Sequence, residues 1–177
     1  MEASNIDKIE TKNTRELYLV ATQFCTFMEN IHTFEPRQII DYLLKIMPLM
    51  YLKGALIQDI QVDETVACEQ FVTEEQYELL YLKLKDKLTE MEFFESYNLQ
   101  ENETKTYSIC EILTDIYQDM KDFVLLYNKN TLTTQENALL MHKKYFIYTW
   151  GKYITILLSY LHQLAYPVVE EEEEIDE

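Results

Sequence analysis

Glycine and proline are scarce in this sequence. The 177 residues include two glycines and three prolines, against an average usage of roughly 7% and 5%. Tight β-hairpin turns and glycine-rich phosphate loops use backbone conformations with positive φ, which glycine adopts at the least cost. The shortage therefore argues against hairpin-rich β folds and against nucleotide-binding P-loops.

Cysteines and long apolar runs are also scarce. The three cysteines, Cys25, Cys68 and Cys110, are too far apart for a Cys-x-x-Cys motif, so free buried thiols are expected. No stretch approaches the about 20 uninterrupted apolar residues of a membrane-spanning helix. The polar N-terminus has no apolar run of signal-peptide length. We expect a cytoplasmic protein that does not bind membranes.

Positive charge is the third shortage. The chain has 15 lysines and arginines and 32 aspartates and glutamates, which gives a net charge of −17. Nucleic acids and anionic membranes are bound through basic side chains, so direct binding to either is not expected. The same charge would attract a basic protein partner.

Helical periodicity is the dominant pattern that is present. Apolar residues recur at every third or fourth position, which is the spacing of one helix face. The expected helices cover residues 14–32, 36–57, 73–91, 108–127 and 133–165. Pro48 is expected to kink or interrupt the second helix. The last helix has the widest apolar stripe and is expected near the centre of the bundle.

The predicted fold is all-α, a single bundle of five to seven mostly antiparallel helices over residues 14–167. Residues 1–13 are expected to be a flexible N-terminus. Residues 168–177 are expected to be a disordered tail, since seven of the last eight residues are acidic and repel one another. Residues 92–106 mix aromatic, Asn and Glu side chains and are expected to be irregular, with at most a short helix.

The helix expected after Ser108 carries four regularly spaced carboxylates. Glu111, Asp115, Asp119 and Asp122 are separated by four, four and three residues, which places them within about 80° of arc on one helix face. This arc lies opposite the apolar stripe, so the carboxylates are expected to face water. An exposed cluster of this kind could contact a basic partner or hold a hard cation such as Mg²⁺ or Ca²⁺.

Other catalytic patterns are weak. The chain has one Glu-x-x-His step, Glu29 and His32, whereas di-iron bundles need two such steps and further glutamates. There is no Gly-x-Ser-x-Gly turn and no cysteine in a catalytic signature, and no cofactor is expected. Tyrosines crowd the last helix around Trp150. They are interpreted as the rim of the core, with an aromatic pocket or a partner-binding face as alternatives.

Four segments resemble one family. They are Met-Pro-Leu-Met-Tyr-Leu-Lys at 47–53, Phe-Val-Thr-Glu-Glu-Gln-Tyr at 71–77, Asp-Ile-Tyr-Gln-Asp-Met-Lys-Asp-Phe at 115–123 and Tyr-Thr-Trp-Gly at 148–151. Together they resemble an uncharacterised family of small acidic helical bacterial proteins, classified only as a domain of unknown function. The resemblance implies a bacterial, intracellular, all-α protein. It also implies a partner that is a nucleic-acid-processing enzyme, because genes of this family lie beside one for a 3′–5′ exonuclease.

Two functions follow from these patterns. The first is a non-catalytic interaction or adaptor protein that recruits a basic protein partner through an acidic helix face. Its candidate interaction surface consists of Asp115, Tyr117, Asp119, Asp122 and Trp150. The alternative is a metal-dependent or small-molecule-binding helical enzyme that uses the same carboxylates. An enzyme needs a concave, partly buried site, so a position of the aspartates in a cleft near His142 or His162 would favour the alternative.

Overall fold

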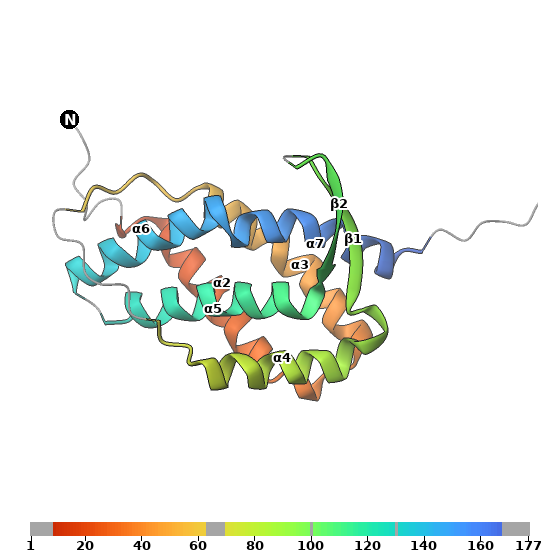
Figure 1. The fold of residues 1–177 in the computed structure, drawn as a ribbon. Helices are drawn as coiled ribbons and strands as arrows, with labels where there is room; N and C mark the ends of the chain where they lie inside the picture. Colours follow the sequence, from red (N-terminus) through yellow and green to blue (C-terminus); the bar gives the residue numbers. More distant parts are fainter. Residues whose placement is uncertain (1–8, 63–69, 100, 130, 168–177) are drawn as a thin grey trace, which may run out of the picture.

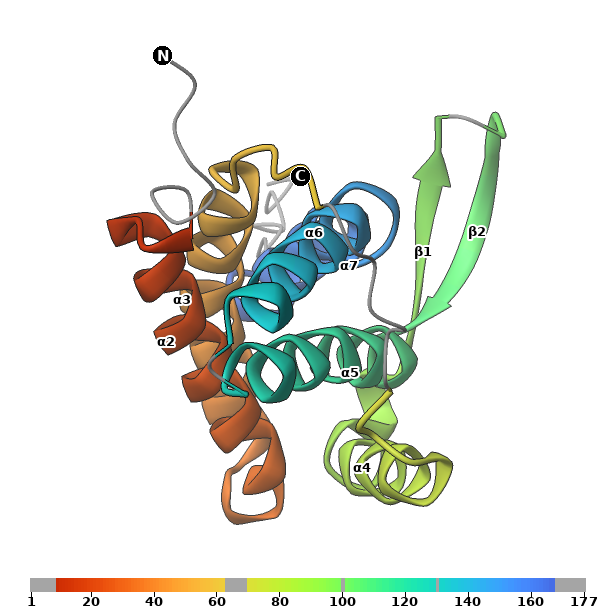
Figure 2. The ribbon, with the colours of Figure 1, turned by 90° about the vertical axis from the view of Figure 1, so that its left-hand side faces the viewer.

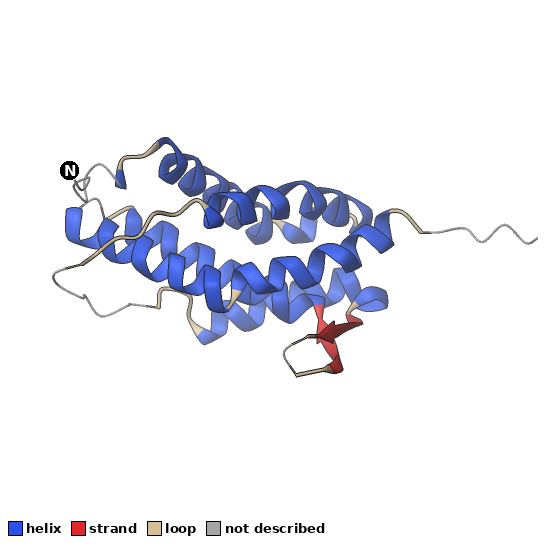
Figure 3. Ribbon diagram, turned by 90° about the horizontal axis from the view of Figure 1, so that it is seen from above, coloured by secondary structure: helices blue, strands red, loops and turns tan. Residues whose placement is uncertain are grey.

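The computed structural model describes residues 9–62, 70–99, 101–129 and 131–167, and it is mainly helical (Figures 1 and 3). Six α-helices lie in these ranges: α2 (Lys12–Glu29), α3 (Pro36–Ala55), α4 (Glu74–Leu88), α5 (Ile109–Tyr127), α6 (Leu132–Tyr148) and α7 (Trp150–Ala165). Short 3₁₀ turns, η1 (Ile31–Thr33) and η2 (Thr89–Met91), follow α2 and α4. Within the described ranges, no helix combines the length and the hydrophobicity that a membrane crossing requires.

Helix α5 lies at the centre of the molecule. It packs against α2, α4, α6 and α7, and Figure 2 shows it between α4 on one side and the α6–α7 pair on the other. Its inward residues Leu113, Ile116 and Met120 are fully buried. The sequence analysis placed the last helix at the centre, but α7 packs mainly against α3 and α6.

The last predicted helix is in fact two helices. The chain leaves the helical conformation at Thr149, with φ −128° and ψ −91°. The Thr149 hydroxyl lies 2.8 Å from a carboxylate oxygen of Asp119 on α5 and 2.8 Å from the carbonyl oxygen of Tyr145, and both can accept its hydrogen. The break therefore depends on a contact with α5. The apolar pattern continues across it, so periodicity alone does not reveal it.

Residues 92–106, expected to be irregular, lie mostly in an antiparallel β-hairpin of β1 (Phe93–Asn98) and β2 (Glu103–Ser108). The hairpin stands away from the helices (Figure 2). The Phe94 ring stacks on Tyr160 of α7, with ring centroids 4.3 Å apart. The turn uses Asn102 at φ 56° where glycine is usual, so the sequence carries no glycine signal for it. The fold is mostly helical with a two-stranded sheet and is not strictly all-α.

The start of the folded part also differs from the prediction. Ile9 is buried in the core and α2 begins at Lys12, so the folded part begins before residue 14. Helix α3 runs without interruption through Pro48. The expected acidic tail, residues 168–177, lies outside the described residues.

The close packing of α3 on the α6–α7 junction depends on Gly54. A β-carbon at this position would lie 2.3 Å from the ring of Trp150 and 2.6 Å from that of Phe146. Contacts this short require the aromatic rings or the helix to move. Gly54 is therefore the position at which α3 comes closest to the buried tryptophan.

We predict that Gly54→Ala lowers the stability of the fold. Overpacking a core costs about 1–3 kcal/mol, which exceeds the gain of up to about 1 kcal/mol in helix propensity. Urea unfolding of the full chain measures the difference. Leu52→Ala is the control, because Leu52 lies on the same helix and is 52% exposed. A Gly54→Ala protein as stable as the parent would contradict this account.

Candidate functional site

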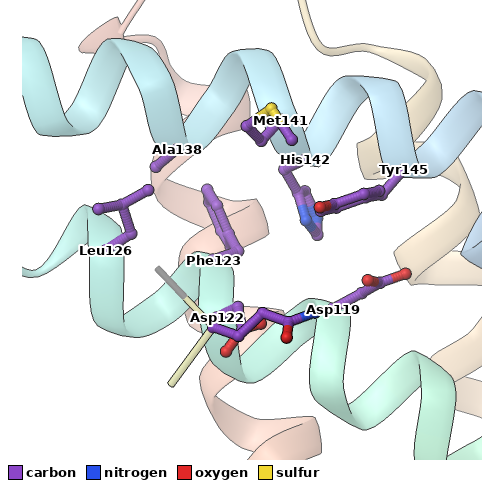
Figure 4. A pocket seen from close by; sticks show the side chains of 9 residues that line it. Asp119, Asp122, Phe123, Leu126, Ala138, Met141, His142 and Tyr145 are labelled. Carbon is purple, nitrogen blue, oxygen red and sulfur yellow. The ribbon is translucent and has the colours of Figure 1, made fainter. Parts of the chain in front are cut away.

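A pocket of about 240 Å³ lies between α5 and α6 (Figure 4). Its lining residues are Asp119, Asp122, Phe123 and Leu126 of α5, Ala138, Met141, His142 and Tyr145 of α6, and Gln70 from the segment before α4. Leu126 and Ala138 lie at one end of the pocket, and Asp119 and Tyr145 lie at the other. The site therefore combines an apolar end with a polar end.

The three aspartates of α5 do not form an open acidic face. Each is partly buried, and each has a different neighbour. Asp115 accepts a 2.7 Å hydrogen bond from the Tyr77 hydroxyl of α4. Asp122 accepts hydrogen bonds of 2.8 and 3.2 Å from the backbone amides of Phe71 and Val72. The expectation that these three carboxylates face water is wrong, because α4, the segment before it and the α6–α7 junction cover this side of α5. Glu111, the fourth carboxylate of the predicted cluster, is exposed as expected.

Asp119 has the largest pKa shift among these carboxylates. Its pKa is raised from 3.8 to about 7, mainly by burial and to a smaller extent by the nearby Asp115 and Asp122. The hydrogen bond from the Thr149 hydroxyl, 2.8 Å long, opposes the shift. The Asp119 carboxyl group therefore changes its charge near neutral pH, whereas an exposed aspartate is fully ionised there.

His142 has the least satisfied polar side chain of the site. It is 1% exposed, and its ring lies between those of Phe123 and Trp150, with centroid distances of 4.2 and 4.9 Å. Neither ring nitrogen has a hydrogen-bond partner within the described part of the chain. Burial lowers the His142 pKa from 6.5 to about 3, so the ring is neutral at physiological pH. It then offers one donor and one acceptor.

This arrangement makes His142 a candidate binding residue. Buried polar atoms without partners are uncommon and cost stability. Figure 4 shows the imidazole pointing from α6 towards α5, above Asp119 and beside Tyr145. The sequence analysis named His142 only as a residue near which the aspartates could lie, and not as a candidate binding residue. Its position three residues after the buried Leu139 was the available signal that the imidazole lies on the inner face of α6.

Tyr117 and Trp150 lie inside the molecule. Tyr117 is 8% exposed, and its hydroxyl donates a 3.0 Å hydrogen bond to Glu29 of α2. Trp150 is fully buried, and its indole N–H donates to the backbone carbonyl of His142 at 3.3 Å. A surface role for either aromatic ring does not fit this placement. The Trp150 ring instead stacks on the His142 ring, and its hydrogen bond to the His142 carbonyl holds α6 in position.

The aspartates do not converge on a metal position. Asp115 and Asp122 are separated by about 10 Å along the axis of an α-helix, and they bind different neighbours. Across residues 9–62, 70–99, 101–129 and 131–167, no group of three or more His, Cys, Asp or Glu side chains is placed to hold a metal ion. The metal-dependent form of the alternative function has no ligand set in these ranges.

We predict that Asp119→Asn stabilises the protein more at pH 8 than at pH 5. The unfolded chain ionises this group near 3.8 and the folded chain near 7. Stability is therefore lost as the pH rises through this window, because the folded state must then carry a buried charge. Asparagine cannot ionise, and its carbonyl can still accept the Thr149 hydrogen bond. Thermal unfolding of both proteins at the two pH values measures the effect.

Asp41→Asn is the matched control for this prediction. Asp41 is an exposed residue of α3, and its hydrogen bond with Lys45 lowers its pKa. Its replacement should bring no gain in stability at pH 8. If the effect of Asp119→Asn is the same at both pH values, Asp119 does not titrate near neutral pH.

Comparison with known proteins identifies the family. The crystal structure of protein BF1032 from Bacteroides fragilis matches this chain with a TM-score of 0.82 and 30% sequence identity, over 93% of this chain and 99% of that one. No curated protein is significantly similar to this chain. The sequence profile described as Domain of unknown function (DUF5063) matches residues 8–167, which include all six helices described above. The resemblance found in the sequence is confirmed, and the chain belongs to the DUF5063 family.

Proposed function

We propose that this protein is a non-catalytic binding protein that holds a small polar ligand in the pocket between α5 and α6. The observation that carries this proposal is His142, a neutral imidazole in the pocket wall with both nitrogens unpaired within the described residues. A ligand with a donor and an acceptor would provide partners for these atoms. Two carboxylates on the opposite wall, Asp119 and Asp122 of α5, add further acceptors.

The size of the pocket limits the ligand. A volume of about 240 Å³ is below the roughly 300–1,000 Å³ of pockets that take drug-sized molecules. A single ring with one polar substituent fits this space, whereas a dinucleotide cofactor does not. Both His142 nitrogens are covered by neighbouring atoms, so a ligand reaches them after a small side-chain movement.

This function has more geometric support than recruitment through an open acidic face. The three aspartates are partly buried and already accept hydrogen bonds from Tyr77, Thr149 and the chain before α4. A second candidate is an acid–base enzyme at the same pocket. It is favoured by the position of Asp119 and Asp122 in a pocket with His142, which is the arrangement that the sequence analysis expected of an enzyme. The pKa of Asp119, about 7, also favours it, because general bases are efficient when their pKa lies near the working pH. Both candidates require ligand binding at this site.

We predict that a small planar probe binds the pocket and that His142→Phe prevents it. Benzamide is a suitable probe, because it has one ring, one carbonyl acceptor and one amide donor. Titration of the ¹⁵N-labelled full chain should shift the resonances of the residues lining the pocket and the ring nitrogens of His142. His142→Phe keeps an aromatic ring between Phe123 and Trp150 but removes both nitrogens. It should therefore abolish the shifts and stabilise the fold by about 1–3 kcal/mol.

His162→Phe is the matched control, because His162 is an exposed residue of α7 outside the pocket. It should leave the benzamide shifts unchanged. The proposal is overturned if benzamide and its charged analogues leave the resonances of the pocket unmoved. Binding that persists in His142→Phe would also overturn it.

A further inference from the structure

We infer that the pocket selects a planar cation with several N–H donors, an amidinium or a guanidinium group, over neutral and anionic ligands of the same shape. This inference rests on the proposed function and specifies its ligand class. Four observations support it: the charges of the lining residues, the free carboxylate oxygens, the aromatic walls and the proton held by Asp119.

Among the described residues, the lining of the pocket carries negative and no positive charge. Asp119 and Asp122 are its two acidic residues, and no lysine or arginine is among the residues that line it. His142 adds no positive charge, because burial keeps its ring neutral. An anionic ligand would therefore meet two carboxyl groups without a compensating cation, whereas a cationic ligand would neutralise them.

The two aspartates each keep one oxygen for a ligand. Asp122 uses Oδ1 for the backbone amides of Phe71 and Val72, and Asp119 uses Oδ2 for Thr149. Their other oxygens make no hydrogen bond to the described residues. Residues three apart on a helix are separated by about 4.5 Å along the axis. The two free oxygens therefore come from successive turns of one helix, and they offer two acceptors to a flat group with N–H donors on more than one side.

The aromatic lining suits the same kind of group. Phe123 and Tyr145 line the pocket from opposite helices. A planar cation can stack on such rings through cation–π attraction. A compact ammonium ion would bind the carboxylates, but it has no flat surface that could stack on the faces of these aromatic rings.

The proton on Asp119 makes the expected binding depend on pH. A cation favours the ionised form of Asp119, so binding at or below pH 7 releases a proton. The titratable groups around this carboxyl are Asp115 and Asp122 of α5, His142 and Tyr145 of α6, and Tyr153 of α7. With an Asp119 pKa of about 7, its ionised fraction falls about tenfold between pH 8 and pH 6.

Two sources can supply such a group. One is a free small molecule, and the other is an arginine side chain of a basic protein partner. The net charge of −17 would favour the approach of either. Both sources present the same planar N–H donors to the pocket.

Three probes of the same shape test the inference: benzamidine, benzamide and benzoate, which are cationic, neutral and anionic. Isothermal titration calorimetry of the full chain at pH 8 should show benzamidine binding at least about tenfold more tightly than benzamide, with no binding of benzoate. The affinity for benzamidine should fall by up to about tenfold at pH 6. Asp119→Asn should remove this pH dependence and reduce the preference for the cation.

Asp115→Asn is the matched control, because Asp115 lies one turn away on α5 and does not line the pocket. It should keep the preference for benzamidine. Equal affinities for benzamidine and benzamide would overturn the inference and leave the proposed function standing. The absence of binding by all three probes would overturn the proposed function itself.

A capped peptide with one arginine between glycines distinguishes the two sources. If the peptide competes with benzamidine and the same peptide with citrulline does not, an arginine side chain can enter the pocket. If only benzamidine binds, the ligand is a free small cation. Either result supports the selection of a planar cation.

Discussion

Helix α5 is enclosed by α2, α4, α6 and α7, so its polar side must find hydrogen-bond partners inside the protein. Burying a carboxylate without partners is costly. Asp115 is therefore paired with Tyr77 of α4, and Asp122 is paired with backbone amides before α4. Asp119 is paired with Thr149 at the α6–α7 break. The positions of three neighbouring segments depend on these bonds.

The same constraint produces the candidate site. The neighbours of α5 satisfy only one oxygen of Asp119 and one of Asp122, and they leave His142 without a partner in the described residues. Functional sites are often the places where a protein tolerates a local cost in stability. A pocket with unsatisfied donors and acceptors on both of its helices is a physical basis for binding, whatever its natural ligand.

The Asp-Ile-Tyr-Gln-Asp run, which contributes to the family resemblance, has a structural explanation. Residues two positions apart on an α-helix differ in direction by about 200° around the helix axis. Tyr117 therefore points away from Asp115 and Asp119. Tyr117 binds Glu29 of α2, while Asp115 binds α4 and Asp119 binds the α6–α7 junction. One short run thus contacts three separate parts of the fold, and only its last aspartate also lines the pocket.

Local patterns in the sequence determined the helical character of the protein and the approximate extent of α2 to α5. These features depend on residues within one or two turns of each other. A helical pattern shows which residues share a face but not what covers that face. The burial of the α5 aspartates, the break at Thr149 and the hairpin at residues 93–108 depend on contacts between distant segments. The tertiary structure alone therefore decided that an apparently solvated acidic face forms one wall of a pocket.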